Sequence, residues 1–134
     1  MDFSWLSDPY YQESLWTGLI NTLVLLVVSA VLGFTLAVGM AMARIKGPRP
    51  LAWLASGVSI VMRGTPLLVQ LFFFYYGIGR LLEGIPGIRE SMFWGILRDP
   101  FFYATLTFTL SVGAYSGEVL RGALLSVPPG EREA

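Results

Sequence analysis

The sequence contains no cysteine and no histidine, and it has few charged residues. Without cysteine there can be no disulfide, no thiol nucleophile and no cysteine-bound metal, and without histidine the commonest metal ligand and general base are absent as well. Only 13% of the 134 residues are charged, whereas 54% are hydrophobic. Soluble domains carry about 25% charged residues, and a domain this small must place most of its residues at its surface. These absences argue against a soluble enzyme and indicate a membrane protein without a metal site or cofactor.

Two further absences narrow the possible functions. Nine basic residues balance nine acidic ones, so no basic field indicates a nucleic-acid partner. No glycine-rich GxxxxGK[ST] segment is present, so any ATP hydrolysis must be performed by another chain. We therefore expect no catalytic residue in this chain.

Three stretches are apolar enough to predict transmembrane helices, so the expected fold class is an all-α, polytopic membrane helical bundle. The first span covers residues 16–43, which include no charged residue and would form a helix about 42 Å long, against a hydrocarbon core of about 30 Å. The second covers residues 50–79, and we expect it to break or kink near Gly64–Pro66, because Pro66 lacks a backbone donor and Gly64 is flexible. The third covers residues 100–120, with Asp99 as its N-cap and Pro100 in its first turn.

Loop charges predict the orientation of these spans. Residues 1–15 contain no basic residue and are expected to be extracytoplasmic. Arg44, Lys46 and Arg49 follow the first span directly and indicate a cytoplasmic turn. The second loop, residues 80–99, would then lie outside, with a short interfacial helix that places Trp94 at the headgroups, and residues 120–134 would be cytoplasmic.

Small residues recur at four-residue spacing on the first and third spans, and such stripes let membrane helices approach closely. They serve either packing within the chain or a subunit interface. The stripes consist of Ser29, Gly33, Ala37 and Ala41 in the first span and Thr109, Gly113 and Gly117 in the third.

Arg63 is a candidate functional residue because a charge near the bilayer centre is costly. It lies mid-membrane if residues 50–79 form one continuous span, and it marks the cytoplasmic end if residues 50–62 lie at the interface. In the first case it must face a partner, a substrate carboxylate or a wet cavity. Gln70, two helical turns further on, is the next polar group on the same face.

Glu118 is the acidic counterpart near the inner end of the third span. Arg121 lies three positions away, so one interpretation is a local ion pair. The other is that Glu118 and Tyr115, also three positions apart, face a central cavity. Arg63 and Glu118 are the near-membrane residues of opposite sign.

Four segments resemble, in the same order, the permeases of polar amino-acid ABC transporters of the histidine, glutamine, arginine and opine type. The most specific segment is Arg63-Gly64-Thr65-Pro66-Leu67-Leu68-Val69-Gln70, which continues to Gly77 and looks like the signature segment of these permeases. The other three are residues 18–23, residues 111–122 and residues 127–134, the last of which looks like the entry to the Glu-Ala-Ala cytoplasmic loop.

The resemblance implies a subunit of a binding-protein-dependent importer in the bacterial plasma (inner) membrane, with a five-helix core of which this chain is the N-terminal part. Its implied partners are a second permease subunit, homologous or identical, a cytoplasmic ATPase and an extracytoplasmic amino-acid-binding protein, besides the lipid bilayer. The Glu-Ala-Ala loop would begin within residues 126–134 and couple to the ATPase, through Pro129, Gly130, Glu131, Arg132, Glu133 and Ala134.

Two other function classes remain open from the residues alone. One is a non-transporting structural or regulatory membrane protein with three spans, and the other is an oligomeric channel subunit, which the small-residue stripes would serve equally well. Because the resembling family continues past residue 134 with two more spans, we also expect this chain to be a fragment.

Overall fold

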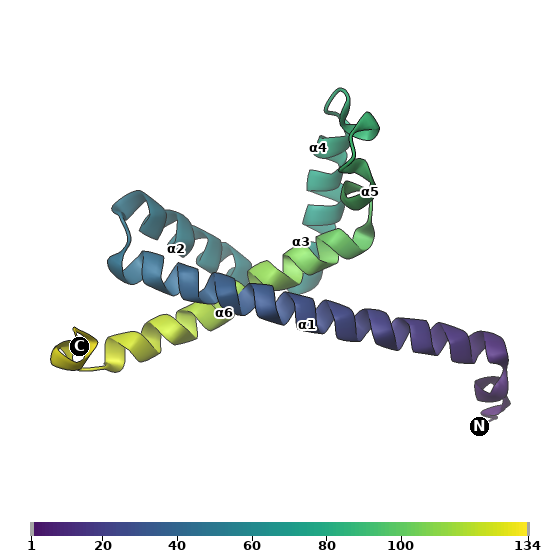
Figure 1. Cartoon of the computed structure of the whole chain (residues 1–134), viewed down its shortest axis with the longest axis horizontal. Coiled ribbons are helices and arrows are strands. Elements are labelled where there is room, and N and C mark those ends of the chain that lie inside the picture. The colour runs from purple at the N-terminus through teal and green to yellow at the C-terminus, as the bar shows by residue number, and fades with distance from the viewer. Residues whose placement is uncertain (1, 134) are drawn as a thin grey trace.

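The computed structural model describes residues 2–133, and every regular element in that part of the chain is helical, as predicted. In chain order the elements are η1 (Ser4–Ser7), α1 (Pro9–Lys46), α2 (Arg49–Gly64), α3 (Leu67–Phe72), the π-helical turn η2 (Phe73–Ile78), α4 (Gly79–Glu83), η3 (Ile88–Glu90), α5 (Trp94–Leu97), α6 (Pro100–Ser126) and α7 (Pro129–Arg132). Figure 1 shows α1 and α6 crossing near the middle of the molecule, with the two termini at opposite ends.

Proline and aspartate define where the two long helices begin. The Asp8 carboxylate accepts a hydrogen bond from the amide of Tyr10 at 3.0 Å, and Pro9 occupies the first turn of α1. Asp99 accepts in the same way from the amide of Phe101 at 2.9 Å, which confirms it as the N-cap of α6. The predicted cap and first-turn residues therefore fix the start of α6.

The main packing contact joins α1 to α6, and the two helices run in the same direction. A Cβ added to Gly33 of α1 would lie 2.6 Å from the Cβ of Val112 in α6. Further along both helices, a Cβ on Gly117 would lie 3.3 Å from the carbonyl oxygen of Ala37. The structure thus places small residues of both stripes at the crossing, where they let the backbones approach. Ser29, Gly33, Ala37 and Ala41 of α1 and Gly113 and Gly117 of α6 are all buried.

The second apolar region does not form one continuous helix. It breaks between Gly64 and Leu67, and the axis turns by 115° between Arg49–Gly64 and Leu67–Glu83. Thr65 is extended at the break, which is the backbone conformation that the following proline favours. The bend lies where the sequence predicts it, and Figure 1 shows α2 folded back beside α1 while α3 and α4 form a separate arm.

Residues 80–99, predicted to be a loop with a short helix, contain the end of α4, then η3 and α5. The expected short helix is present as α5, which begins at Trp94, and the position of Trp94 at the headgroups stays a prediction. Tyr103 of α6 anchors this region because its ring is buried and its hydroxyl donates to the carbonyl oxygen of Leu97 at 2.7 Å. The segment of residues 80–99 is thereby attached to the first turn of α6.

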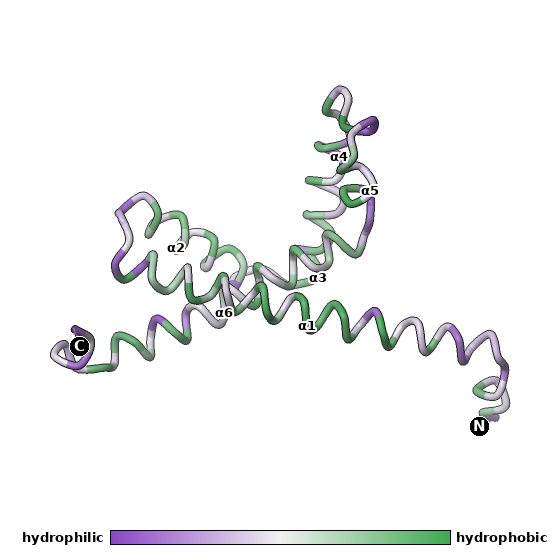
Figure 2. The backbone as a smooth tube through the Cα atoms, in the orientation of Figure 1, coloured by the Kyte–Doolittle hydropathy of each residue, from purple (hydrophilic) through white to green (hydrophobic). Residues whose placement is uncertain are grey.

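By length and composition, α1 could cross a membrane, and so could the bent pair if its two parts form one span. Figure 2 shows the continuous hydrophobic middle of α1. Among the described helices α6 does not meet the same criterion, because threonine, serine and tyrosine recur along its length. The helices also extend beyond the predicted spans, since α1 starts at Pro9 and α6 ends at Ser126. The limits 16–43, 50–79 and 100–120 therefore stay predictions.

Candidate functional site

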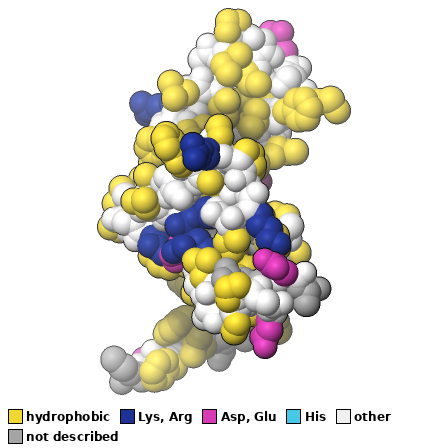
Figure 3. Space-filling model, turned by 90° about the vertical axis from the view of Figure 1, so that its left-hand side faces the viewer, with side chains coloured by type: hydrophobic (Ala, Val, Ile, Leu, Met, Phe, Trp, Pro, Cys, Tyr) yellow, Lys and Arg dark blue, Asp and Glu magenta, His cyan; other side chains and the backbone are white. Residues whose placement is uncertain are grey.

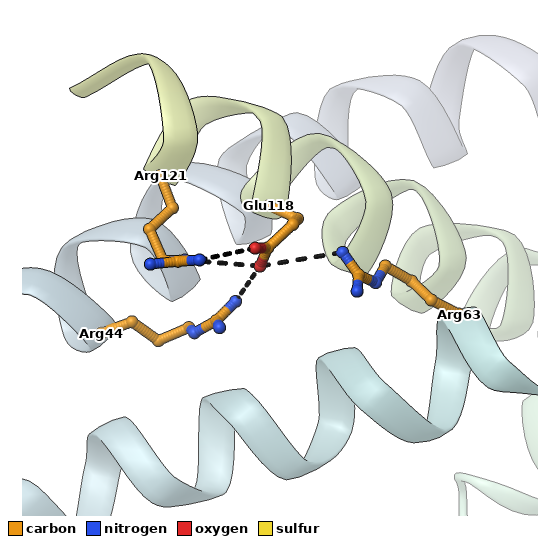
Figure 4. A network of polar contacts seen from close by, with 4 residues as sticks. All are labelled: Arg44, Arg63, Glu118 and Arg121. Carbon is orange, nitrogen blue, oxygen red and sulfur yellow. Dashed lines mark hydrogen bonds and ion pairs between the residues drawn. The ribbon is translucent and has the colours of Figure 1, made fainter. Parts of the chain in front are cut away.

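One carboxylate joins three arginines from three helices, and Figure 4 shows them converging on it. The Glu118 cluster, as we call it, consists of Glu118 and Arg121 of α6, Arg44 of α1 and Arg63 of α2. Arg121 donates from Nη2 to Oε1 of Glu118 at 2.7 Å, and Arg44 donates from Nη1 to Oε2. Nη1 of Arg63 lies 3.8 Å from the same Oε2. The local pair with Arg121 is thus present, and two distant arginines join it.

The arginines of the Glu118 cluster differ in how firmly they are held. Arg44 is the least exposed, with 16% of its side chain accessible, whereas Arg63 has 34% accessible and the longest contact. Both carboxylate oxygens of Glu118 already accept hydrogen bonds from guanidinium groups. The arrangement therefore leaves Arg63, rather than Glu118, as the group best able to change partners.

Helical periodicity explains why these side chains meet, although loop charge alone was the expected role of Arg44. Arg44 lies three residues after Ala41 and seven after Ala37, so it shares the face that packs on α6. Glu118 lies four residues after the buried Ala114, on the face of α6 that packs on α1. One further turn of the α1 stripe reaches Arg44, and one turn beyond the buried Ala114 reaches Glu118, so this spacing was a signal for the pair.

The break between α2 and α3 is held by two more of the predicted site residues. Gln70 is buried, and its side-chain nitrogen donates to the carbonyl oxygens of Met62 at 2.6 Å and Thr65 at 2.9 Å. Tyr115 donates from its hydroxyl to the carbonyl oxygen of Arg63 at 3.3 Å. Carbonyls at the end of a helix lack intrahelical partners, so these side chains replace the bonds that the break removes.

The four residues predicted for the substrate path therefore gather around one helix break. Arg63 lies at the end of α2, where Tyr115 and Glu118 of α6 contact it. Gln70 of α3 donates a hydrogen bond across the break to Met62. Tyr115 is 53% exposed, whereas Gln70 is only 5% exposed. The side-chain oxygen of Gln70 is buried without a hydrogen-bond partner among residues 2–133.

The predicted coupling segment follows α6 after a two-residue interruption at Val127 and Pro128. Pro129, Gly130, Glu131 and Arg132 form the short helix α7, which starts with the amide of Glu131 donating to the carbonyl oxygen of Pro128 at 3.0 Å. Glu131 and Glu133 are exposed, and Ala134 lies outside the described residues. The segment is therefore short, charged and separated by only two residues from the helix that carries Glu118.

Two hollows flank the α3–α4 arm. One, of about 240 Å³, is lined by Tyr75, Tyr76, Gly79, Arg80, Glu83, Leu97, Arg98 and Tyr103. The other, of about 260 Å³, lies beside Gln70 and is otherwise lined mainly by apolar side chains of α2, α3 and η2. Among the described residues, no three histidine, cysteine, aspartate or glutamate side chains gather as metal ligands.

Comparison with known proteins adds a family assignment. The sequence profile of the family described as "Binding-protein-dependent transport system inner membrane component" matches residues 33–134. The octopine transport system permease protein OccM of Rhizobium radiobacter is 40% identical over 124 residues, which cover 90% of this chain and 48% of that protein. The L-cystine transport system permease protein TcyB of Bacillus subtilis is 39% identical over 127 residues, or 92% of this chain and 49% of TcyB.

A third relative is the histidine/lysine/arginine/ornithine transport system permease protein HisM of Salmonella typhimurium, 36% identical over 95% of this chain and 55% of HisM. Among solved structures, the crystal structure of an amino acid ABC transporter with histidines matches with a TM-score of 0.73 and 29% identity, over 99% of this chain and 55% of that one. The chain spans about half the length of the curated relatives it matches.

Proposed function

This chain belongs to the family of binding-protein-dependent transport system inner membrane components, and we propose that it forms part of the permease subunit of an importer for polar amino acids. Three relatives named for octopine, L-cystine, and histidine, lysine, arginine and ornithine transport support this substrate class. The match to an amino acid ABC transporter structure over nearly the whole chain supports it further.

The proposed assembly combines this permease subunit with a binding protein and an ATPase, which the family description implies, and with a second permease subunit. A five-helix core, to which this chain contributes three spans, would pair with a second permease subunit in the bacterial inner membrane. A separate ATPase would bind at α7 in the cytoplasm, and an extracytoplasmic binding protein would deliver the amino acid. The parallel direction of α1 and α6 agrees with the predicted topology, in which the N-terminus is extracytoplasmic and both helices run inward.

The observation that carries this proposal is the Glu118 cluster. It links α6, which continues into α7, to Arg63 at the end of α2. If a bound ATPase moves α7, the movement would therefore pass to α6 and, through the contact between Glu118 and Arg63, to the bend between α2 and α3. A bent helix with a charged hinge at its end is a suitable element for opening and closing a path.

The substrate path would pass the same break. Arg63 is the best placed cation for a substrate carboxylate, because its contact to Glu118 is the longest and its side chain the most exposed of the three arginines. Tyr115 offers a partly exposed hydroxyl beside it. Glu118 would hold Arg63 in place, and Gln70 would keep the bend rigid.

The test is amino-acid uptake by the full-length transporter with its ATPase and binding protein. We expect Arg63→Leu and Glu118→Leu to abolish uptake while assembly of the complex, measured by co-purification, stays intact. Arg89→Leu is the matched control, because Arg89 lies on the outer loop with 66% of its side chain exposed and should leave uptake unchanged. Normal uptake in both test variants would remove this site from the mechanism.

The same assay separates the two other function classes, which the family assignment does not favour. A structural or regulatory protein would form its complex without any ATPase. A channel subunit would pass its solute without ATP. Uptake that requires ATP and the binding protein would exclude both.

A further inference from the structure

The Glu118 cluster carries more positive than negative charge. Three guanidinium groups share a single carboxylate, and no second carboxylate of residues 2–133 lies within 4.0 Å of them. All four side chains are at most 34% exposed, so water screens the surplus incompletely. Figure 3, which is turned by 90° from the view of Figure 1, shows several Lys and Arg side chains near the middle of the face that it draws. A partly buried surplus of this kind is expected to attract an anion.

The bend between α2 and α3 indicates where this surplus lies in the bilayer. If the α3–α4 arm crosses the membrane, a turn of 115° leaves α2 close to the membrane plane. Trp53, which is 79% exposed on α2, would then lie at the headgroup level that tryptophan favours. Arg44 and Arg121 stand near the ends of α1 and α6 that the loop charges assign to the cytoplasm. This placement rests on the orientation in the proposed function.

We propose that the Glu118 cluster binds the headgroup of an anionic phospholipid of the cytoplasmic leaflet. A phosphate diester offers oxygen acceptors to which arginine donates in a planar, two-bond geometry. Arg63 is the primary donor, since its exposed guanidinium needs the smallest movement to leave Glu118. Basic pockets between helices on the cytoplasmic side suit such headgroups. A zwitterionic lipid has no net charge, so it would leave the two surplus positive charges of the cluster unbalanced.

The test measures lipid binding directly, without transport. The full-length permease complex is purified in detergent, mixed with equal amounts of dioleoyl phosphatidylglycerol and dioleoyl phosphatidylcholine, and examined by native mass spectrometry. We expect the wild type to retain phosphatidylglycerol preferentially and Arg63→Gln to lower that preference about fivefold, the equivalent of one basic residue at a lipid surface. Arg63→Gln leaves the shorter Arg44 and Arg121 bonds in place, so the cluster should still fold.

Two controls make the result decisive. Glu118→Gln removes the carboxylate and should raise the preference, whereas Arg89→Gln on the outer loop should leave it unchanged. Equal loss in Arg63→Gln and Glu118→Gln would mean that the cluster is only an internal ion network. Displacement of the lipid by millimolar inorganic phosphate would show that a free anion, and not a lipid, occupies the site. Because no uptake is measured, this outcome is independent of whether Arg63 contributes to transport.

Discussion

The side-chain amide of Gln70 donates a hydrogen bond to the main-chain carbonyl of Met62, 2.6 Å away across the break between α2 and α3. The same nitrogen also contacts both oxygens of Thr65. A buried polar side chain thus supplies the hydrogen bonds that a continuous helix would have made with its own backbone. The bend is therefore built into the resting fold.

Replacing Gln70 should weaken that bend. Gln70→Leu keeps a similar volume but leaves the carbonyls of Met62 and Thr65 without their donor, at a cost of about 1–3 kcal/mol for buried unsatisfied groups. Thermal unfolding of the full-length permease in detergent measures the loss. Gln12→Leu is the control, because Gln12 is exposed and makes a single hydrogen bond, to the carbonyl oxygen of Leu6. A loss of similar size in both variants would mean that Gln70 does not hold the break.

The crossing of α1 and α6 should tolerate no added methyl group at Gly33. A Cβ there would lie 2.6 Å from Val112 and 3.2 Å from the carbonyl oxygen of Thr109, so the helices must separate. We expect Gly33→Ala to cost about 1–3 kcal/mol, as overpacking does elsewhere. Gly39→Ala on the same helix meets nothing within 4 Å and should raise the free energy of unfolding by about 0.5–1 kcal/mol, because alanine is the better helix former. Equal stability of the two variants would contradict the observed crossing.

The three arginines of the Glu118 cluster should contribute unequally to stability. Arg44 is the least exposed and donates directly to Glu118, so Arg44→Gln should cost about 1.5–3 kcal/mol, the range for hydrogen bonds to charged groups. Arg63→Gln should cost under about 1 kcal/mol, because its contact is long and partly solvated. Unfolding of both variants by denaturant gives the two values, and the reverse order would refute the assignment of Arg63 as the mobile member.

Much of this architecture could be predicted from local patterns. The break at Gly64–Pro66 follows from backbone chemistry at two residues, and the start of α6 follows from Asp99 and Pro100. The buried faces of α1 and α6 follow from four-residue spacing of small side chains. In each case the cause lies within one turn of the residue concerned.

What the sequence could not supply was the relation between distant segments. Arg44 and Glu118 are 74 positions apart, and each had a sufficient local interpretation, as a loop charge and as the partner of Arg121. The choice between a mid-membrane and an interfacial Arg63 depended on the angle at the break, which residue types do not specify. The bend of 115° separates α2 from the α3–α4 arm, and Arg63 lies beside α6.

The absence of cysteine allows a clean test of the predicted orientation and of the coupling segment. Ser4→Cys and Glu131→Cys place single thiols at exposed positions near opposite ends of the chain. In intact cells that produce the full-length protein, a membrane-impermeant maleimide should label position 4 and leave position 131 unlabelled until the membrane is opened. The reverse pattern would invert the topology and move α7 away from any cytoplasmic ATPase.

After permeabilisation, the purified ATPase should protect position 131 and leave position 4 reactive, because a docked partner covers α7 alone. If the ATPase does not change the labelling of position 131, the coupling role of α7 would be refuted. The topology would still hold, because it rests on the labelling of intact cells.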